Sequence, residues 1–217
     1  MAFYTDCRLY LLAPAALDDP DAFAAPLAEA LGAGDVAAFL LDLPEADEAT
    51  LSAAARVLMP VCHAHGVAFM LGRRPALAAT LGCDGVHIGA QDGTVQAARK
   101  ALGPDRQLGV SCGGSRDRAM DAAEAGADYV AFGSLPEPVP LPDTPAADPE
   151  TLRVWTTFSV IPAVATGGIT TTNCLPLIQA GANFLAVSDG VWGYKNGPAA
   201  AVREFNRVIA TATPSVA

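Results

Sequence analysis

The chain has 217 residues, of which 52% are hydrophobic and 17% charged, so it has the composition of a globular protein with a sizeable core. A net charge of −10, from 23 acidic against 13 basic residues, argues against nucleic acid or an anionic membrane surface as a partner. No apolar run approaches the roughly 18 residues of a membrane span, and the first residues do not form a secretory leader, so we expect a cytoplasmic protein.

Short apolar runs recur along the whole chain without polar alternation. This pattern predicts strands that are buried on both faces, as in a parallel sheet. The runs lie at 8–13, 36–43, 67–71, 84–88, 107–111, 127–132, 160–165 and 183–188.

Alanine-rich amphipathic stretches separate these runs and predict helices at 21–33, 46–65, 75–81, 92–101, 115–125, 148–158, 171–180 and 198–212. Several end in a glycine that reads as a helix cap, in HAHGV, TLGCD, EAGAD and QAGAN. Eight strands that alternate with eight helices predict a (β/α)8 TIM barrel, a single domain over residues 1–217. A doubly wound open sheet is the alternative.

Two loops of this barrel fall on the face where such folds carry their active sites. Residues 133–148 form a long proline-rich loop after the sixth strand, and the seventh strand ends in Gly167 and Gly168 before Thr-Thr-Thr-Asn, which we expect to open a helix. Adjacent glycines serve a turn with positive φ or a ligand that approaches bare amides. We predict that they bind a phosphate together with Ser188 and Asp189 after the eighth strand, a turn without ligand being the alternative.

The cysteines and histidines do not suggest a zinc site. Five cysteines, at 7, 62, 83, 112 and 174, never form Cys-x-x-Cys, and we expect them to be reduced. His63 and His65 lie two apart on an expected helix and so point in different directions. His87 ends an apolar strand, where we expect a packed or hydrogen-bonded side chain.

Six segments, in order and at similar spacing, resemble the thiamine phosphate synthase and thiazole tautomerase superfamily: RLYLLA, CDGVHIGAQD, ALGPDRQLGVSC, AGADYVAFGS, IPAVATGGITTTN and AGANFLAVS. The resemblance implies a TIM barrel that joins a hydroxymethylpyrimidine diphosphate to a thiazole phosphate and releases pyrophosphate. It implies that Mg²⁺ and cationic side chains stabilise the departing pyrophosphate. It also implies that the thiazole phosphate binds in the loops after strands seven and eight.

The chain departs from the family pattern at the cationic and metal positions. Leu40, Asp42 and Pro44 replace a Gln-x-Arg-x-Lys motif, while Gly72 and Arg73 replace an Asn-Asp pair whose Asp binds magnesium. The second metal carboxylate remains, as Asp92. One carboxylate makes a poor Mg²⁺ site unless substrate phosphates supply further oxygens.

Other family positions divide between kept and lost residues. The proline-rich loop replaces a Thr-x-Thr-Lys motif and contains no Lys or Arg, and Gly113 stands where the tautomerases carry a histidine. Ser111 is kept and is a candidate catalytic residue. The phosphate-facing serine of the eighth strand matches Ser188 or Asp189, depending on a one-residue shift.

Arg73 is the second candidate catalytic residue. An arginine at the end of the third strand can replace the positive charge of a metal with a bidentate contact to phosphate or carboxylate. A solvated pair with Arg74 at the start of a helix is the alternative.

Three functions are compatible with these observations. The first is a thiamine phosphate synthase whose catalytic residues are partly lost. The second is a non-catalytic paralogue that binds a phosphorylated heterocycle as carrier, sensor or pathway partner. The third is a different lyase or isomerase built on a cluster of Arg73, Asp92 and Asp42. The sequence leaves open whether the chain forms a homo-oligomer.

Overall fold

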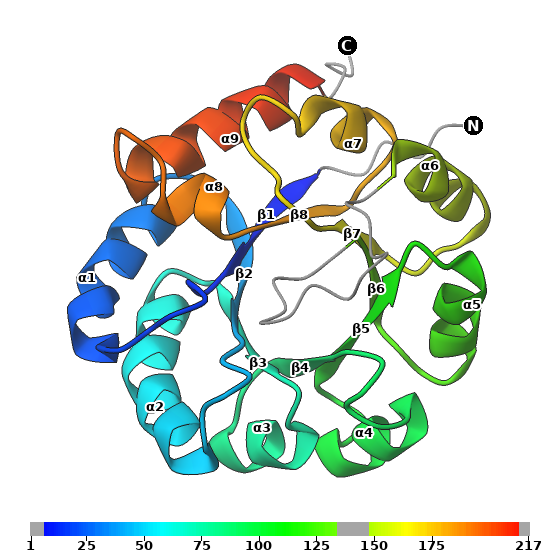
Figure 1. Ribbon diagram of the computed structural model, residues 1–217, viewed down its shortest axis with the longest axis horizontal. Helices are drawn as coiled ribbons and strands as arrows, with labels where there is room; N and C mark the ends of the chain where they lie inside the picture. The colour runs from blue at the N-terminus through cyan, green and yellow to red at the C-terminus, as the bar shows by residue number, and fades with distance from the viewer. Residues whose placement is uncertain (1–6, 134–147, 213–217) are drawn as a thin grey trace.

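The computed structural model describes residues 7–133 and 148–212. They form a closed barrel of parallel strands in the order β1 to β8, with β8 hydrogen-bonded to β1. Closure confirms the predicted TIM barrel, and the alternative of an open sheet is wrong. Figure 1 shows the helices as a ring around the strands.

Each predicted strand is present, close to its expected bounds. The strands are β1 Arg8–Leu12, β2 Val36–Leu41, β3 Ala68–Gly72, β4 Gly85–Ile88, β5 Gln107–Gly113, β6 Tyr129–Phe132, β7 Ala163–Ala165 and β8 Phe184–Val187.

The predicted helices are present too, with a short additional one after β8. They are α1 Pro20–Leu31, α2 Glu48–Ala64, α3 Pro75–Leu81, α4 Val95–Leu102, α5 Arg116–Glu124, α6 Pro149–Phe158, α7 Leu175–Gln179, α8 Asp189–Trp192 and α9 Pro198–Ala212. None of those in the described residues is long and apolar enough to cross a membrane.

Glycines at the ends of four helices let the chain turn into the next strand. Gly66, Gly82, Gly126 and Gly181 all have positive φ, the conformation that glycine adopts without a steric cost. The predicted caps are therefore confirmed.

One predicted helix start is wrong. Thr-Thr-Thr-Asn does not open a helix, because Asn173 closes a turn in front of α7 instead. Its side-chain oxygen accepts from the Thr170 amide at 2.8 Å, and its amide nitrogen donates to the Gly168 carbonyl at 2.9 Å. The helix itself begins only at Leu175.

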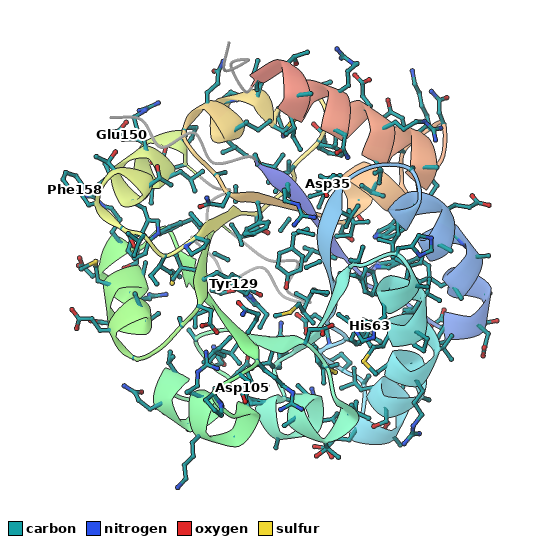
Figure 2. All side chains as sticks on the ribbon, turned by 180° about the vertical axis from the view of Figure 1, so that it is seen from behind. Asp35, His63, Asp105, Tyr129, Glu150 and Phe158 are labelled. Atoms are coloured by element: carbon teal, nitrogen blue, oxygen red, sulfur yellow. The ribbon has the colours of Figure 1, made fainter. Side chains whose placement is uncertain are left out.

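Inside the barrel, two large side chains pack against glycines of neighbouring strands. A Cβ at Gly109 of β5 would lie 2.0 Å from the Tyr129 ring, and one at Gly85 of β4 would lie 2.4 Å from the end of Met70. Figure 2 shows Tyr129 inside the ring of strands, whereas Glu150 and Phe158 lie on α6 at the outer edge of the molecule. The glycines thus make room for a polar aromatic ring inside the barrel.

The proline-rich loop lies mostly outside the described residues. Its ends, Gly133 and Asp148, are described: the Gly133 amide donates to the Gly113 carbonyl at 2.9 Å, and Asp148 caps α6. The expectation that 133–148 forms an irregular loop remains a prediction.

Candidate active site

Three charged side chains meet where β2, β3 and β4 end. Arg73, just after β3, contacts Asp42 after β2 with two nitrogens, Nε to Oδ1 at 2.9 Å and Nη2 to Oδ2 at 3.3 Å. Its Nη1 also lies 3.9 Å from Asp92 Oδ1. The side chains of Arg73, Asp42 and Asp92 are only 19%, 17% and 13% exposed. The expected cluster therefore exists, and the alternative of a solvated Arg73 is wrong.

The backbone at Arg73 has an unusual conformation. Its φ of 67° is the only positive value at a non-glycine residue among residues 7–133 and 148–212. Its amide donates to the His87 carbonyl at 2.8 Å, and the next residue, Arg74, donates through its side chain to the Ala46 carbonyl at 3.0 Å. A left-handed conformation costs an arginine about 1–2 kcal/mol, and such strain concentrates at functional sites.

Gly72 is required beneath this cluster for a steric reason. A Cβ at this position would lie 2.3 Å from Asp42 Oδ1, far inside contact distance. A side chain at position 72 therefore excludes the observed position of the Asp42 carboxylate. The absence of a side chain at Gly72 and the position of the Asp42 carboxylate therefore depend on each other. This dependence is not visible in the sequence, where the two residues are far apart.

Ser111 lies at the end of a buried chain of hydroxyl and imidazole groups. Ser111 Oγ is 2.9 Å from His87 Nε2, and His87 Nδ1 is 3.1 Å from the Tyr129 hydroxyl. The Tyr129 hydroxyl in turn lies 2.9 Å from that of Tyr10. Burial, and secondarily the charge of Arg73, lowers the pKa of His87 to about 3, so the imidazole is neutral.

The sequence predicted His87 as a packed or hydrogen-bonded residue, and the structure shows it buried with two hydrogen-bond partners. The sequence did not, however, predict its contact with Ser111 or the hydrogen bonds of Tyr10 and Tyr129. The available signal was a histidine within the apolar run Gly-Val-His-Ile, since a buried imidazole needs polar partners. The other histidines bind elsewhere: His63 Nε2 contacts Asp84, and His65 Nδ1 contacts the Val61 carbonyl.

The loops after β7 and β8 pack against each other. Gly167 and Gly168 have φ values of 106° and 59°, so both need the freedom of glycine for the turn. A Cβ at Gly168 would have no atom within 4 Å, whereas one at Gly190 would lie 2.3 Å from the Ile169 carbonyl oxygen. The amides of Gly167 and Gly168 donate to no acceptor among the described residues. Open space thus lies beside the Cα of Gly168.

The structure gives Ser188 and Asp189 different surroundings. The Ser188 hydroxyl donates to the Ala13 carbonyl at 3.1 Å, so this side chain joins the loops after β8 and β1. Asp189 is exposed and begins α8. Neither side chain approaches the glycine loop through a hydrogen bond among the described residues.

Asp92 is held by the loop that follows β4. Its Oδ2 accepts from the Gly89 amide at 2.7 Å, while Oδ1 faces Arg73. The described residues contain no group of three His, Cys, Asp or Glu side chains that could hold a metal. The guanidinium of Arg73 already pairs with Asp42 and lies near Asp92, so these residues by themselves do not fit a resident Mg²⁺.

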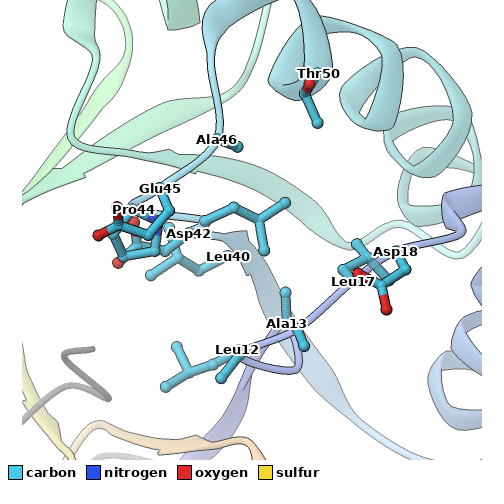
Figure 3. Close-up of a pocket in the computed structure, with 13 residues that line it drawn as sticks. Leu12, Ala13, Leu17, Asp18, Leu40, Asp42, Pro44, Glu45, Ala46 and Thr50 are labelled. Carbon is cyan, nitrogen blue, oxygen red and sulfur yellow. The ribbon is translucent and has the colours of Figure 1, made fainter.

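A cavity of about 360 Å³ opens beside Asp42, between the loops after β1 and β2. Figure 3 shows Leu12 and Leu40 on one side of it, Asp18 and Leu17 on another, and Thr50 of α2 beyond. Apolar walls with a few carboxylates at this size suit a small heterocyclic ring.

Except for Tyr10, inside β1, and Tyr129, at the start of β6, the groups of the candidate site lie at or near the carboxyl ends of parallel strands and hence on one face of the barrel. That is the face on which TIM barrels carry their active sites. The structure brings together Arg73, Asp42 and Asp92 by direct contact, and it places Ser111 on the neighbouring strand β5. Gly167, Gly168, Ser188 and Asp189 form a separate group on the same face.

Comparison with known proteins agrees with this arrangement. The family model for thiamine monophosphate synthase matches residues 9–191. The chain is 52% identical to a thiamine-phosphate synthase of Rhodospirillum centenum, over 94% of this chain and 99% of that one. It is 46% identical to a thiamine-phosphate synthase of Hyphomonas neptunium, over 92% of each.

A solved structure shows the same fold. Thiamine phosphate pyrophosphorylase from Pyrococcus furiosus superposes with a TM-score of 0.82 at 24% identity, covering 97% of this chain and 99% of that one. The matches extend over nearly the whole barrel, including β4, β5 and most of the face that carries the candidate site. The chain belongs to the thiamine monophosphate synthase family.

Proposed function

We propose that this protein is a thiamine phosphate synthase, which joins a hydroxymethylpyrimidine diphosphate to a thiazole phosphate and releases pyrophosphate. The observation that carries the proposal is 52% identity, over 94% of the chain, to a protein of that name. The geometry of the barrel face supports it, because a cation, a serine and a glycine loop all lie at strand ends.

In the proposed reaction the bond between the pyrimidine methylene carbon and the diphosphate oxygen breaks, and its electrons leave with pyrophosphate. The lone pair of the thiazole nitrogen forms the new carbon–nitrogen bond. Negative charge therefore grows on the leaving group, and a fixed positive charge beside it lowers the barrier. Arg73 is the proposed catalytic cation, because its guanidinium can exchange the Asp42 carboxylate for a phosphate of similar bidentate geometry.

Ser111 is proposed to contact the same substrate from β5. Its hydroxyl is held by His87 at 2.9 Å and lies on the strand next to the one that precedes Asp92. The cavity beside Asp42 is proposed to receive the pyrimidine ring, with Leu12 and Leu40 as apolar walls. This places the leaving group toward Arg73.

The thiazole phosphate is proposed to bind at the loops after β7 and β8. The amides of Gly167 and Gly168, which donate to no acceptor among the described residues, and the open space beside the Cα of Gly168 support binding of a phosphate despite the net charge of −10. Ser188 and Asp189 remain proposed neighbours of this phosphate through the loop after β8. The Ser188 contact with Ala13 favours a role for its backbone over its hydroxyl.

Magnesium enters the proposal only together with substrate. Asp92 can give one carboxylate oxygen to an Mg²⁺ ion whose remaining ligands come from the diphosphate and water, where the ion would add positive charge beside the leaving group. No step is assigned to that ion, because the described residues do not form a metal cage.

One observation favours a non-catalytic binding protein as the second candidate. The cluster of Arg73, Asp42 and Asp92 carries a formal charge of one cation and two anions, so it repels an incoming diphosphate unless Asp42 is displaced. A protein that only binds the thiazole phosphate needs the glycine loop and no leaving-group cation.

A cytoplasmic location belongs to the same proposal. All five cysteines are buried and unbridged, which suits a reducing compartment. The proposed partners are small phosphorylated heterocycles, and a homo-oligomer remains an open prediction.

An assay with both substrates and Mg²⁺, coupled to pyrophosphate detection, tests the synthase. We expect turnover that depends on both substrates and falls sharply in Arg73→Ala. Absence of product together with calorimetric binding of thiazole phosphate would support the binding protein instead. Absence of both product and binding would remove both candidates.

A further inference from the structure

A continuous chain of hydrogen bonds links the barrel interior to the mouth. It runs from Tyr10 to Tyr129 at 2.9 Å, on to His87 at 3.1 Å, and to Ser111 at 2.9 Å. Tyr10, Tyr129 and His87 are 4%, 8% and 4% exposed, whereas Ser111 is half-buried at the open end. Four side chains, each from a different strand, are thus linked in series by three hydrogen bonds.

Counting the hydrogens gives this chain a direction. Each tyrosine and the serine carries one hydroxyl hydrogen, and a neutral imidazole carries one N–H, on Nδ1 or on Nε2. If Nδ1 holds the hydrogen, it donates to Tyr129, and Ser111 donates to Nε2. One tyrosine hydroxyl then has no protein acceptor among the described residues and needs a water in the cavity of about 240 Å³ that Tyr10 and Tyr129 line. Without that water, the unsatisfied donor costs about 1–3 kcal/mol.

The other tautomer leaves no buried donor unused. Tyr10 donates to Tyr129, Tyr129 donates to Nδ1, and Nε2–H donates to the Ser111 oxygen. The one hydrogen left over is that of the Ser111 hydroxyl, which lies at the mouth. There a substrate atom can accept it.

We propose that His87 is a positioning residue, which donates from Nε2 to Ser111 and so obliges the serine hydroxyl to donate its own hydrogen to the bound substrate. The substrate atom that it meets is then an acceptor, a phosphate oxygen or a ring nitrogen, and never a donor. This inference rests on the proposed synthase function for its consequence in catalysis, but the tautomer itself is a property of the free protein.

The surroundings of His87 keep the imidazole neutral, as this arrangement requires. Its side chain is enclosed by the barrel and faces Ser111 of β5 and Tyr129 of β6, with the cation of Arg73 nearby. Both burial and that cation lower the pKa of His87. A protonated imidazole would have to donate to Tyr129, which would reverse the direction of the inner bonds.

The first test is the tautomer, measured by two-bond ¹⁵N–¹H correlation spectra of the free, full-length protein. His87→Gln identifies the signals, because the chain has only 3 histidines. We expect protonated Nε2 and unprotonated Nδ1, unchanged from about pH 5 to about pH 8. Protonated Nδ1, or titration in this range, would overturn the inference. No substrate is needed, so the result stands whether or not the synthase proposal holds.

The second test is a set of variants that separates positioning from structure. His87→Leu removes the donor, and we expect kcat/KM to fall roughly 10- to 100-fold, the effect of losing one aligned hydrogen bond to a charged group. His87→Gln presents an amide N–H near the position of Nε2–H and should retain most activity. Met70→Leu, a volume-conserving change in the same interior, should leave activity unchanged.

A double-mutant cycle completes this test. Because His87 acts through Ser111, the double variant of Ser111→Ala with His87→Leu should be no slower than Ser111→Ala alone. Additive losses, or His87→Gln as impaired as His87→Leu with both folded by thermal melting, would show a merely structural role. If the wild type has no turnover, the same comparison is made with the affinity for thiamine phosphate measured by calorimetry. If that also fails, the synthase proposal falls, and the tautomer alone decides on the donor direction.

Discussion

Arg73 binds Asp42 with two nitrogens across the ends of β3 and β2, from a backbone that is left-handed at φ 67°. The resemblance to the synthases places the opposite charges at these two positions, Arg after the second strand and Asp after the third. This chain therefore has the same two charges on exchanged strands: the carboxylate follows β2 and the guanidinium follows β3. An ion pair between neighbouring strand ends depends on the distance between the charges, so either order can satisfy it.

Replacing Arg73 should separate the effect of charge from that of backbone strain. Arg73→Gly and Arg73→Ala both lose the guanidinium, so we expect similar losses of activity. Glycine also relieves the left-handed conformation, so Arg73→Gly should be about 1 kcal/mol more stable to urea unfolding than Arg73→Ala. Equal stabilities would show that the observed φ carries no strain.

Gly72→Ala should destabilise the protein through Asp42. The new Cβ would lie 2.3 Å from Asp42 Oδ1, and we expect a loss of about 1–3 kcal/mol in urea unfolding. An Asp42→Gly background removes the Asp42 Cβ, 2.8 Å from the new Cβ, as well as the carboxylate, so there the same substitution should cost far less. An unchanged cost in that background would mean that the glycine serves another contact.

Gly168→Val should abolish binding of inorganic phosphate and of thiazole phosphate, measured by calorimetry, while most of the fold remains. At φ 59° a side chain is strained, but its Cβ would meet no atom within 4 Å, so we expect the valine to fill the open space beside Gly168 that the phosphate would occupy. Gly66→Val is a matched control, because Gly66 has φ 67° and equally open surroundings after α2. Phosphate affinity like that of the wild type in Gly168→Val would show that the glycines serve only the turn.

Acid should destabilise the protein through His87. The pKa of His87 is lowered to about 3 in the folded state from an ordinary 6.5, so the unfolded chain binds the proton first. The stability from the neutral imidazole is complete above about pH 6.5 and is lost as the pH falls toward 3, by about 1.4 kcal/mol per pH unit. Urea unfolding of the wild type and of His87→Gln between about pH 7 and pH 4.5 measures this difference. Parallel curves would contradict it.

The order of strands and helices was predictable from the sequence because it depends on local features. Continuous apolar runs mark strands that are buried on both faces, and the glycines at 66, 82, 126 and 181 mark helix ends that need positive φ. The start of α7 was predicted wrongly, since the side chain of Asn173 competes with the backbone for the hydrogen bonds of that turn. Ser111 and Asp92 were chosen because they match the family pattern, and Arg73 because it departs from it. The catalytic roles of Ser111 and Arg73 and the metal-binding role of Asp92 stay predictions.

By itself the sequence determined which residues lie at the carboxyl ends of the strands, and so which face carries the site. Only the tertiary structure decided which of them touch. Arg73 and Asp42 are 31 positions apart and meet because β2 and β3 pair in parallel. Tyr10 and Tyr129 are 119 apart and meet across the interior of the closed barrel. The inward direction of His87 and the space that Gly109 leaves for Tyr129 follow from strand register, which the apolar pattern leaves undetermined, because these strands are buried on both faces.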